Sequence, residues 1–198
     1  MSTTTSDRLT PAGERILATA SALFYEHGIG AVGVDRIADE AATTKKTLYD
    51  RFGSKKGLTL AYLNRRYETW QRFLAERLER APASGVDHVL AVYDALDAWM
   101  RTNTRGCGFI NAFAELAGTG HSGLGVIHAE KTTIRELYVQ LVADLGIADA
   151  ERLGDQLSLL HEGAIVASTA GGRPEAVRLA RETAEELMTH ALGAGHPR

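Results

Sequence analysis

The sequence predicts an all-α fold, because its apolar residues recur three and four positions apart along most of the chain. That spacing places them on one face of a helix, whereas no alternating run typical of a strand is sustained. Capping residues and glycines separate the periodic stretches, as at Thr10 and Gly28. We therefore expect an N-terminal three-helix domain that contains a helix-turn-helix, followed by a C-terminal helical domain.

The first expected helix begins after Thr10, whose side chain caps it, and has Pro11 in its first turn. It ends near Gly28. Its apolar face is formed by Ile16, Leu17, Ala20, Leu23 and Phe24.

The second and third expected helices are short and almost contiguous. Only Ala42 and Thr43 separate them, Thr44 caps the third, and Gly53 ends it. Two short helices across so tight a turn predict a helix-turn-helix. The residues expected to be buried are Val34, Ile37, Ala38 and Ala41 in the second helix, and Leu48 and Phe52 in the third.

A long helix is expected from Ser54 toward Arg80, where the sequence APASG ends it. About 26 residues at ~1.5 Å each span ~40 Å, so this helix can connect the first domain to the second. Further helices are expected over residues 86–101, 107–118, 125–145, 152–170 and 174–192. We place the helix-turn-helix domain at residues 1–53, the start of the connecting helix at 54–80 and the second domain at 81–198.

Composition narrows the class of protein. The chain has 198 residues, of which 44% are hydrophobic and 24% are charged, as in a globular protein. No run approaches the ~18 apolar residues of a membrane span, and MSTTTSDRLT lacks the apolar core of a signal peptide. Cys107 is the only cysteine, which excludes an intramolecular disulfide and a cysteine-rich zinc site. We expect a cytoplasmic protein.

Charge is divided unevenly along the chain, whose net charge is −3. Residues 1–80 hold 13 Lys and Arg against 10 Asp and Glu, whereas residues 81–198 hold 9 against 15. The first part is therefore positive and the second negative, which favours an anionic partner for the first part.

Two lysine pairs, Lys45-Lys46 and Lys55-Lys56, lie in the first turns of expected helices. The helix macrodipole is positive there, so a cation costs ~0.3–1 kcal/mol unless an anion is near. Phosphate would be such an anion, because helix N-termini bind it. The alternative is a solvated lysine-rich surface, but two pairs beside a helix-turn-helix favour a nucleic acid.

Residues 14–58 resemble the DNA-binding domain of the tetracycline-repressor (TetR) family of bacterial regulators. The resemblance rests on the pattern of the first helix, Gly28, the IA pair at 37–38, TLY at 47–49, Phe52 and Ser54-Lys55. The motif RGCGFINAFAEL, the GHSG loop and the two final helices also resemble the regulatory domain of one TetR subgroup. Two positions differ from the family: Ala42 replaces the usual turn glycine, and Gly33 replaces the usual Thr or Ser cap of the second helix.

In a helix-turn-helix the second helix of the motif enters the major groove, with its N-terminal residues at the base edges. We expect Lys45 and Thr47 to contact bases and Lys46 to contact either bases or backbone. Tyr49, Lys55 and the amide end at Ser54 are expected to bind phosphates. The predicted DNA-binding residues are Thr44, Lys45, Lys46, Thr47, Tyr49, Ser54 and Lys55.

The last two expected helices carry stripes of small and apolar residues, which allow helices to approach closely. The TetR resemblance implies that this pair forms a four-helix bundle with its copy, giving a homodimer. Two operator half-sites ~34–36 Å apart also require two recognition helices, one from each copy of the chain. The alternative is that both stripes pack inside the monomer. The stripes are Leu153, Leu157, Leu160 and Ala164, and Val177, Ala180, Ala184, Leu187 and Ala191.

Aromatic and polarizable side chains concentrate between residues 93 and 113, as they do in ligand pockets. We expect them to bind an apolar or aromatic effector, the alternative being an ordinary core. The resemblance implies that such an effector favours a dimer in which the spacing of the two recognition helices no longer matches the spacing of the operator half-sites. The predicted ligand-binding residues are Tyr93, Trp99, Met100, Phe109, Asn111 and Phe113.

These inferences predict a ligand-responsive transcriptional repressor that a small molecule releases from its operator. A helical enzyme and a nonspecific architectural DNA-binding protein are the alternatives. No catalytic residue, metal site or cofactor is predicted, because Cys107 with His121 is an unspecific pairing and no ligand spacing joins His121 to His128, Glu115 or Glu130. The effector, the operator, a metal near His121 and the choice between repressor and activator are left open.

Overall fold

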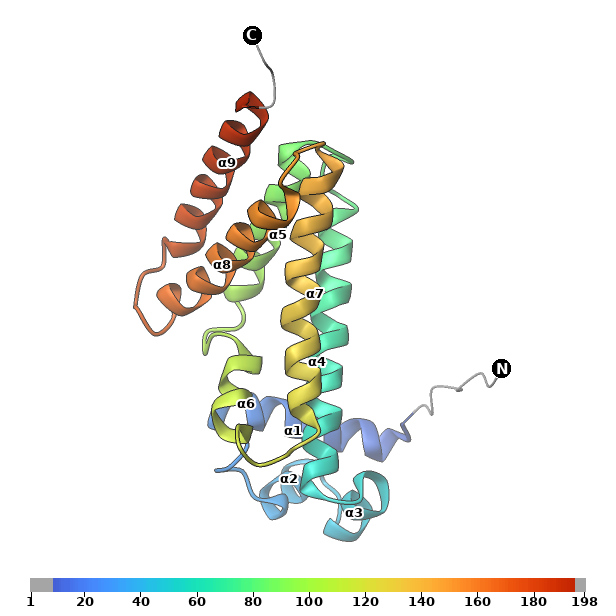
Figure 1. The fold of residues 1–198 in the computed structure, drawn as a ribbon. Helices are drawn as coiled ribbons and strands as arrows, with labels where there is room; N and C mark the ends of the chain where they lie inside the picture. The colour runs from blue at the N-terminus through green and yellow to red at the C-terminus, as the bar shows by residue number, and fades with distance from the viewer. Residues whose placement is uncertain (1–8, 195–198) are drawn as a thin grey trace, which may run out of the picture. The chain divides into compact units, whose positions relative to one another are not determined.

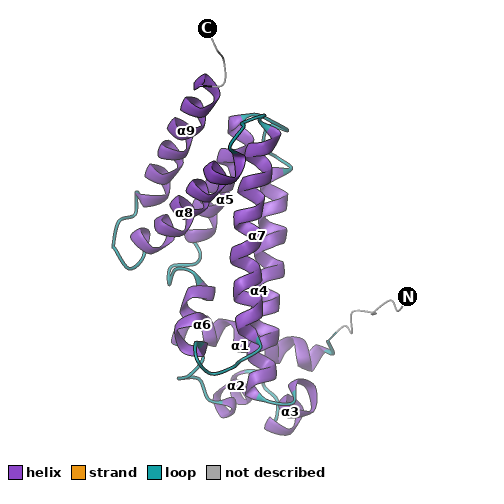
Figure 2. Ribbon diagram, in the orientation of Figure 1, coloured by secondary structure: helices purple, strands orange, loops and turns teal. Residues whose placement is uncertain are grey.

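The structure is a computed structural model that describes residues 9–194. Within that range the secondary structure is helical, and Figure 2 shows helices joined by loops. The predicted all-α fold is confirmed. The described helices, labelled in Figure 1, are α1 (Pro11–His27), α2 (Val34–Glu40), α3 (Lys45–Phe52), α4 (Lys55–Leu78), α5 (Val86–Met100), α6 (Gly108–Leu116), α7 (Gly123–Asp144), α8 (Ala150–Ser168) and α9 (Ala176–Ala194).

The chain divides into two compact units, which we call the reading unit and the second unit. The reading unit contains the residues up to 66 together with residues 109–126. The second unit contains residues 67–108 and those from 127 onward. Helix α6 therefore belongs to the same unit as the first three helices, from which some fifty residues of chain separate it, whereas α4 and α7 each continue from one unit into the other.

The core of the reading unit comes from the apolar faces that the periodicity predicts. Helices α1, α2 and α3 pack on one another. Thr10 caps α1 by accepting a hydrogen bond from the N–H of Gly13 at 3.3 Å, and Gly28, with a φ of 90°, ends it. The side chains with no exposed surface are Ile16, Ala20, Val32, Ile37, Leu48, Leu58 and Leu63.

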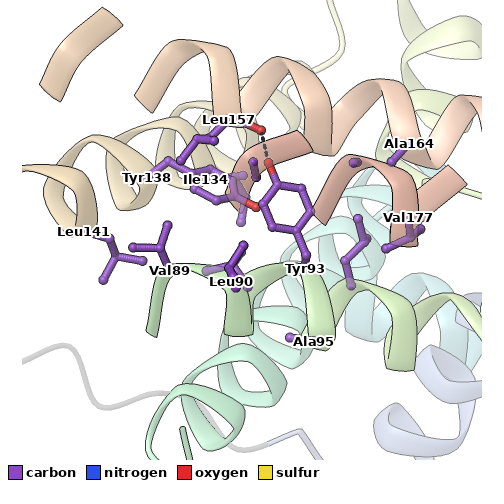
Figure 3. Packing of buried hydrophobic residues seen from close by; sticks show 14 of the residues in the cluster. Val89, Leu90, Tyr93, Ala95, Ile134, Tyr138, Leu141, Leu157, Ala164 and Val177 are labelled. Carbon is purple, nitrogen blue, oxygen red and sulfur yellow. Dashed lines mark hydrogen bonds between the residues drawn. The ribbon is translucent and has the colours of Figure 1, made fainter. Parts of the chain in front are cut away.

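The second unit packs α9 against α5 and α8 and also contains most of α7. Figure 3 shows its core, in which the hydroxyl of Tyr93 donates a hydrogen bond to the carbonyl of Leu157 at 2.7 Å. The hydroxyl of Tyr138 lies 3.0 Å from Nδ1 of His161, which is also buried. Every helix within residues 9–194 is too short or too polar to cross a bilayer.

The stripes expected to meet a second copy face this core instead. Leu153, Leu157 and Ala164 of α8 are buried, as are Val177, Ala180 and Ala184 of α9. The reason is that α8 and α9 pack on each other and on α5 within one chain. The alternative, that the stripes pack inside the monomer, is therefore the correct one for these six residues, whereas Leu160, Leu187 and Ala191 are only partly buried.

Candidate nucleic-acid interface

Helices α2 and α3 form the helix-turn-helix, and the turn that joins them is a Schellman motif. The N–H of Thr43 donates to the carbonyl of Ala38 at 2.9 Å, and the N–H of Ala42 donates to that of Asp39 at 3.1 Å. This motif requires a left-handed residue at its centre, and Ala42 has a φ of 48°. A side chain is strained in that conformation, so the turn forms at a cost that a glycine at this position would avoid.

The two helices of the motif begin differently. Thr44 caps α3, because its Oγ1 accepts the N–H of Thr47 at 3.1 Å. The same oxygen lies 3.0 Å from Oγ1 of Thr47, so the two hydroxyls form a pair at the start of the helix. Helix α2 starts after Gly33, which provides no side-chain cap.

One face of α3 is buried and the other is open. Leu48 is fully buried against the other helices of the reading unit. Lys45, Lys46 and Tyr49 are exposed, and Thr47 is half-buried. The residues predicted to meet base edges therefore lie at the surface, in the first turn and a half of α3.

Both lysines of α3 already have carboxylate partners in the reading unit. Nζ of Lys46 lies 2.7 Å from Asp50, one turn along the helix, and Lys45 forms an ion pair with Asp35 in the first turn of α2. These carboxylates supply an anion near each lysine when no DNA is present. Exposed ion pairs are worth only ~0–1 kcal/mol, so a phosphate or a base edge can replace them at little cost.

The start of α4 contains the remaining predicted phosphate contacts. Oγ of Ser54 accepts the N–H of Gly57 at 3.0 Å, which caps the helix. Nζ of Lys55 donates to the carbonyl of Gly30 at 3.5 Å and lies 6.0 Å from the centre of the Phe24 ring. Partial burial lowers the pKa of Lys55, and the negative charge of Glu115 opposes that shift.

The six predicted effector-binding residues lie in both units. Trp99 packs against Trp70 and Phe73, with ring centres 5.2 Å from each, and Tyr93 is fully buried. These two residues have the contacts of a packed core. Tyr93, Trp99 and Met100 belong to α5 of the second unit, whereas Phe109, Asn111 and Phe113 belong to α6 of the reading unit.

Glu115 is part of the reading unit, which its position in the sequence does not indicate. Its carboxylate accepts hydrogen bonds from the N–H groups of Ile29 and Gly30, at 2.9 and 2.5 Å. The two glycines of the sequence GIG, residues 28–30, were the only signal of such a close approach. Nδ1 of His121 accepts a hydrogen bond from the N–H of Gly123 at 2.9 Å. Within residues 9–194 no group of three His, Cys, Asp or Glu side chains could hold a metal ion.

The capped and cation-bearing second helix of a helix-turn-helix defines a DNA-binding domain. Residues 16–62 match the family described as bacterial regulatory proteins, tetR family. The chain is 31% identical to SCO4454, a TetR-family transcriptional regulator from Streptomyces coelicolor, with a TM-score of 0.78 over 92% of this chain and 95% of that one. The chain belongs to the TetR family and is a DNA-binding transcriptional regulator, not an enzyme.

Two curated relatives match over shorter segments. The transcriptional activator FasR of Mycolicibacterium smegmatis is 45% identical over 51 residues, which are 26% of this chain and 23% of FasR. The transcriptional repressor NemR of Escherichia coli is 30% identical over 80 residues, which are 40% of each chain. The match thus spans less than half the length of either relative.

Proposed function

We propose that this regulator is a repressor that binds a two-fold symmetric operator as a homodimer and leaves it when a small apolar or aromatic molecule binds. The observation that carries the proposal is the exposed start of α3, where Lys45 and Thr47 are available to base edges. The adjacent Tyr49, Lys55 and the N-terminus of α4 at Ser54 provide donors for phosphates. Base contacts specify the sequence, and phosphate contacts hold the helix in register.

The homodimer is supported by the outer face of α8. Leu159 is 72% exposed and Val166 is 49% exposed, and both lie on the same face as Gly163. Leu179 of α9 is exposed as well, at 37%. Apolar side chains left open beside a glycine suit close packing against a second copy of the same two helices.

Repression is supported by the match to NemR, a repressor, which covers more of this chain than the match to the activator FasR does. Release by an effector is supported by the aromatic residues Trp70, Phe73 and Trp99 of the second unit. The indole N–H of Trp70 is buried and has no hydrogen-bond partner among the described residues. Such a donor suits a planar molecule that carries an acceptor.

The test of the proposed function is sequence discrimination. We would enrich a duplex from a random-sequence pool with the wild-type chain and compare its Kd with that of a scrambled duplex of the same composition. Thr47→Ala or Lys45→Ala should reduce the discrimination by ~1–3 kcal/mol, because each variant removes a base contact. Lys56→Ala, which removes an exposed cation beside the interface, should weaken binding to both duplexes equally.

Equal losses of affinity for both duplexes in Thr47→Ala and Lys45→Ala would refute the assignment. A wild-type chain that enriches no duplex would instead be a nonspecific architectural protein.

A further inference from the structure

The loop between α1 and α2, residues 28–33, is held from the side by α6. Both carboxylate oxygens of Glu115 are used: Oε1 accepts the N–H of Ile29 at 2.9 Å, and Oε2 accepts the N–H of Gly30 at 2.5 Å. Glu115 and this loop both belong to the reading unit. The carboxylate thus fills an anion site made of two consecutive backbone N–H groups.

The loop is shaped for this approach. A Cβ atom added to Gly28 would lie 3.0 Å from Oε1 of Glu115, and one added to Gly30 would lie 3.1 Å from Oε2. Gly28 also has a φ of 90°, which side chains rarely adopt. The two glycines therefore give the carboxylate access to the backbone on both sides of Ile29.

The loop in turn positions two parts of the candidate interface. Helix α2 follows it directly and has no side-chain cap at Gly33 to hold its first turn. Lys55 donates to the carbonyl of Gly30, so one residue of the loop binds both Glu115 and Lys55. A movement of Gly30 would thus move the start of α2 and the ammonium of Lys55 together.

We propose that Glu115 is a positioning residue for DNA binding, which fixes loop 28–33 and through it the start of α2 and Lys55. Glu115 acts without touching DNA. This inference rests on the proposed role of α3 and Lys55 in sequence-specific binding. It makes α6 a structural part of the reading unit, although Glu115 lies 86 residues from Ile29 in the sequence.

The direction in which DNA affinity changes when Glu115 is replaced distinguishes a positioning role from a purely electrostatic one. DNA is an anion, so removing a carboxylate near the interface should strengthen binding to any duplex if charge alone acts. A positioning role predicts the opposite on the preferred duplex, because the interface then loses its geometry. It also predicts that Glu115→Asp, which keeps the charge but shortens the side chain, weakens binding.

The experiment compares full-length wild type with Glu115→Gln, Glu115→Asp and the control Glu26→Gln. Glu26 is exposed in the last turn of α1, and among residues 9–194 its ionic contact is one of 3.9 Å with His27. On the duplex enriched by the wild-type chain, we expect Glu115→Gln and Glu115→Asp to bind about five- to tenfold more weakly than wild type, as loss of a charge-assisted hydrogen bond implies. On scrambled DNA the loss should be smaller, because only the phosphate contact of Lys55 is affected there and base contacts contribute nothing. If both variants instead bind the enriched duplex as tightly as Glu26→Gln does, the proposal is wrong.

A second measurement needs no DNA. Amide hydrogen exchange at Ile29 and Gly30 should be at least about tenfold faster in Glu115→Gln than in wild type, while the amide of the buried Leu48 is unchanged. Unchanged exchange at both loop amides would overturn the proposal even if DNA binding had weakened. A wild-type chain that enriches no duplex refutes the proposed function, and the exchange rates still test the contact of Glu115.

Discussion

At the scale of single residues, one helix end of the reading unit contains a strained residue. Ala42 occupies the left-handed position of the α2–α3 turn with a φ of 48°, and its side chain is exposed. A left-handed conformation costs a residue with a Cβ roughly 1–2 kcal/mol. Glycine avoids that cost but loses about 0.5–1 kcal/mol through its greater freedom in the unfolded chain.

Ala42→Gly should therefore stabilise the protein, by about 0.5–1 kcal/mol in the free energy of unfolding. Urea denaturation measures the change. The control is Ala18→Gly, at an exposed position inside α1, which should destabilise by roughly 0.5–1 kcal/mol because glycine disfavours a helix interior. If both variants were destabilised alike, the turn would not be strained at Ala42.

Asp50 offsets the positive charge of Lys46 at the start of α3, because its carboxylate lies 2.7 Å from Nζ of that lysine. Asp50→Asn should strengthen binding to enriched and scrambled duplexes alike, by about two- to fivefold at low salt, and the gain should shrink as salt screens the charges. Titrations at two salt concentrations measure it. Asp87→Asn, at an exposed residue of α5 in the second unit, should leave both affinities unchanged. A gain limited to the enriched duplex would assign Asp50 a role in base recognition.

At the scale of helices, α7 and α8 of the second unit bury a polar cluster in an otherwise apolar core. Burial, and secondarily the positive charge of Lys131, lowers the pKa of His161 to about 3. Nζ of Lys131 lies 2.8 Å from Glu162 of α8 and 3.0 Å from the adjacent Glu130. The cluster couples the packing of the two helices to pH.

The sign of this coupling follows from His161. The unfolded chain takes up a proton on this histidine near pH 6.5, whereas the folded chain does so only near pH 3. Below pH 6.5 the unfolded state therefore binds more protons, so the stability that is fully present above pH 6.5 is lost as the pH falls. Between pH 7 and pH 5 the loss from this residue should be about 2 kcal/mol.

Urea denaturation of wild type and His161→Asn between pH 7 and pH 5 measures this contribution. Asn retains a polar group beside Tyr138 but cannot titrate, so the stability of the variant should fall by about 2 kcal/mol less than that of wild type. His190→Asn, at an exposed residue of α9, should parallel wild type. Parallel curves for His161→Asn would show that His161 does not stay neutral in the folded chain.

At the scale of the whole molecule, the proposed homodimer would bring two copies of the reading unit to the operator. The exposed Leu159 and Val166 of α8 are the best candidates for the contact between copies. A monomer presents one α3 helix to one half-site and loses the gain from binding two half-sites at once.

Leu159→Arg should therefore convert the protein to a monomer in analytical ultracentrifugation, because it places a charge in the proposed interface. Its affinity for the enriched duplex should fall at least tenfold. Its melting temperature measured at matched concentration separates dissociation from unfolding. Ile110→Arg, which puts the same charge at an exposed residue of α6, should remain a dimer. A dimeric Leu159→Arg would place the contact elsewhere.

The sequence by itself determined the helices and the helix-turn-helix. Thr10 and Thr44 are predicted as caps, and each accepts the backbone N–H three residues ahead. The apolar faces of α1 to α3 are predicted from periodicity and are buried, apart from Val34 and Phe52, which are half-buried. These features depend on residues within one helical turn of each other, so the local sequence contains the information that they need.

Only the tertiary structure decided which distant groups meet. The inner stripes of α8 and α9 pack within the chain, which leaves the outer face of α8, with Leu159, exposed. Lys45 is paired with Asp35 of α2, and Glu115 holds loop 28–33 across 86 residues of chain. A helical pattern shows which residues share a face but not what covers that face. That choice depends on how all the helices pack together, because burial and hydrogen-bond satisfaction are properties of the whole packed unit.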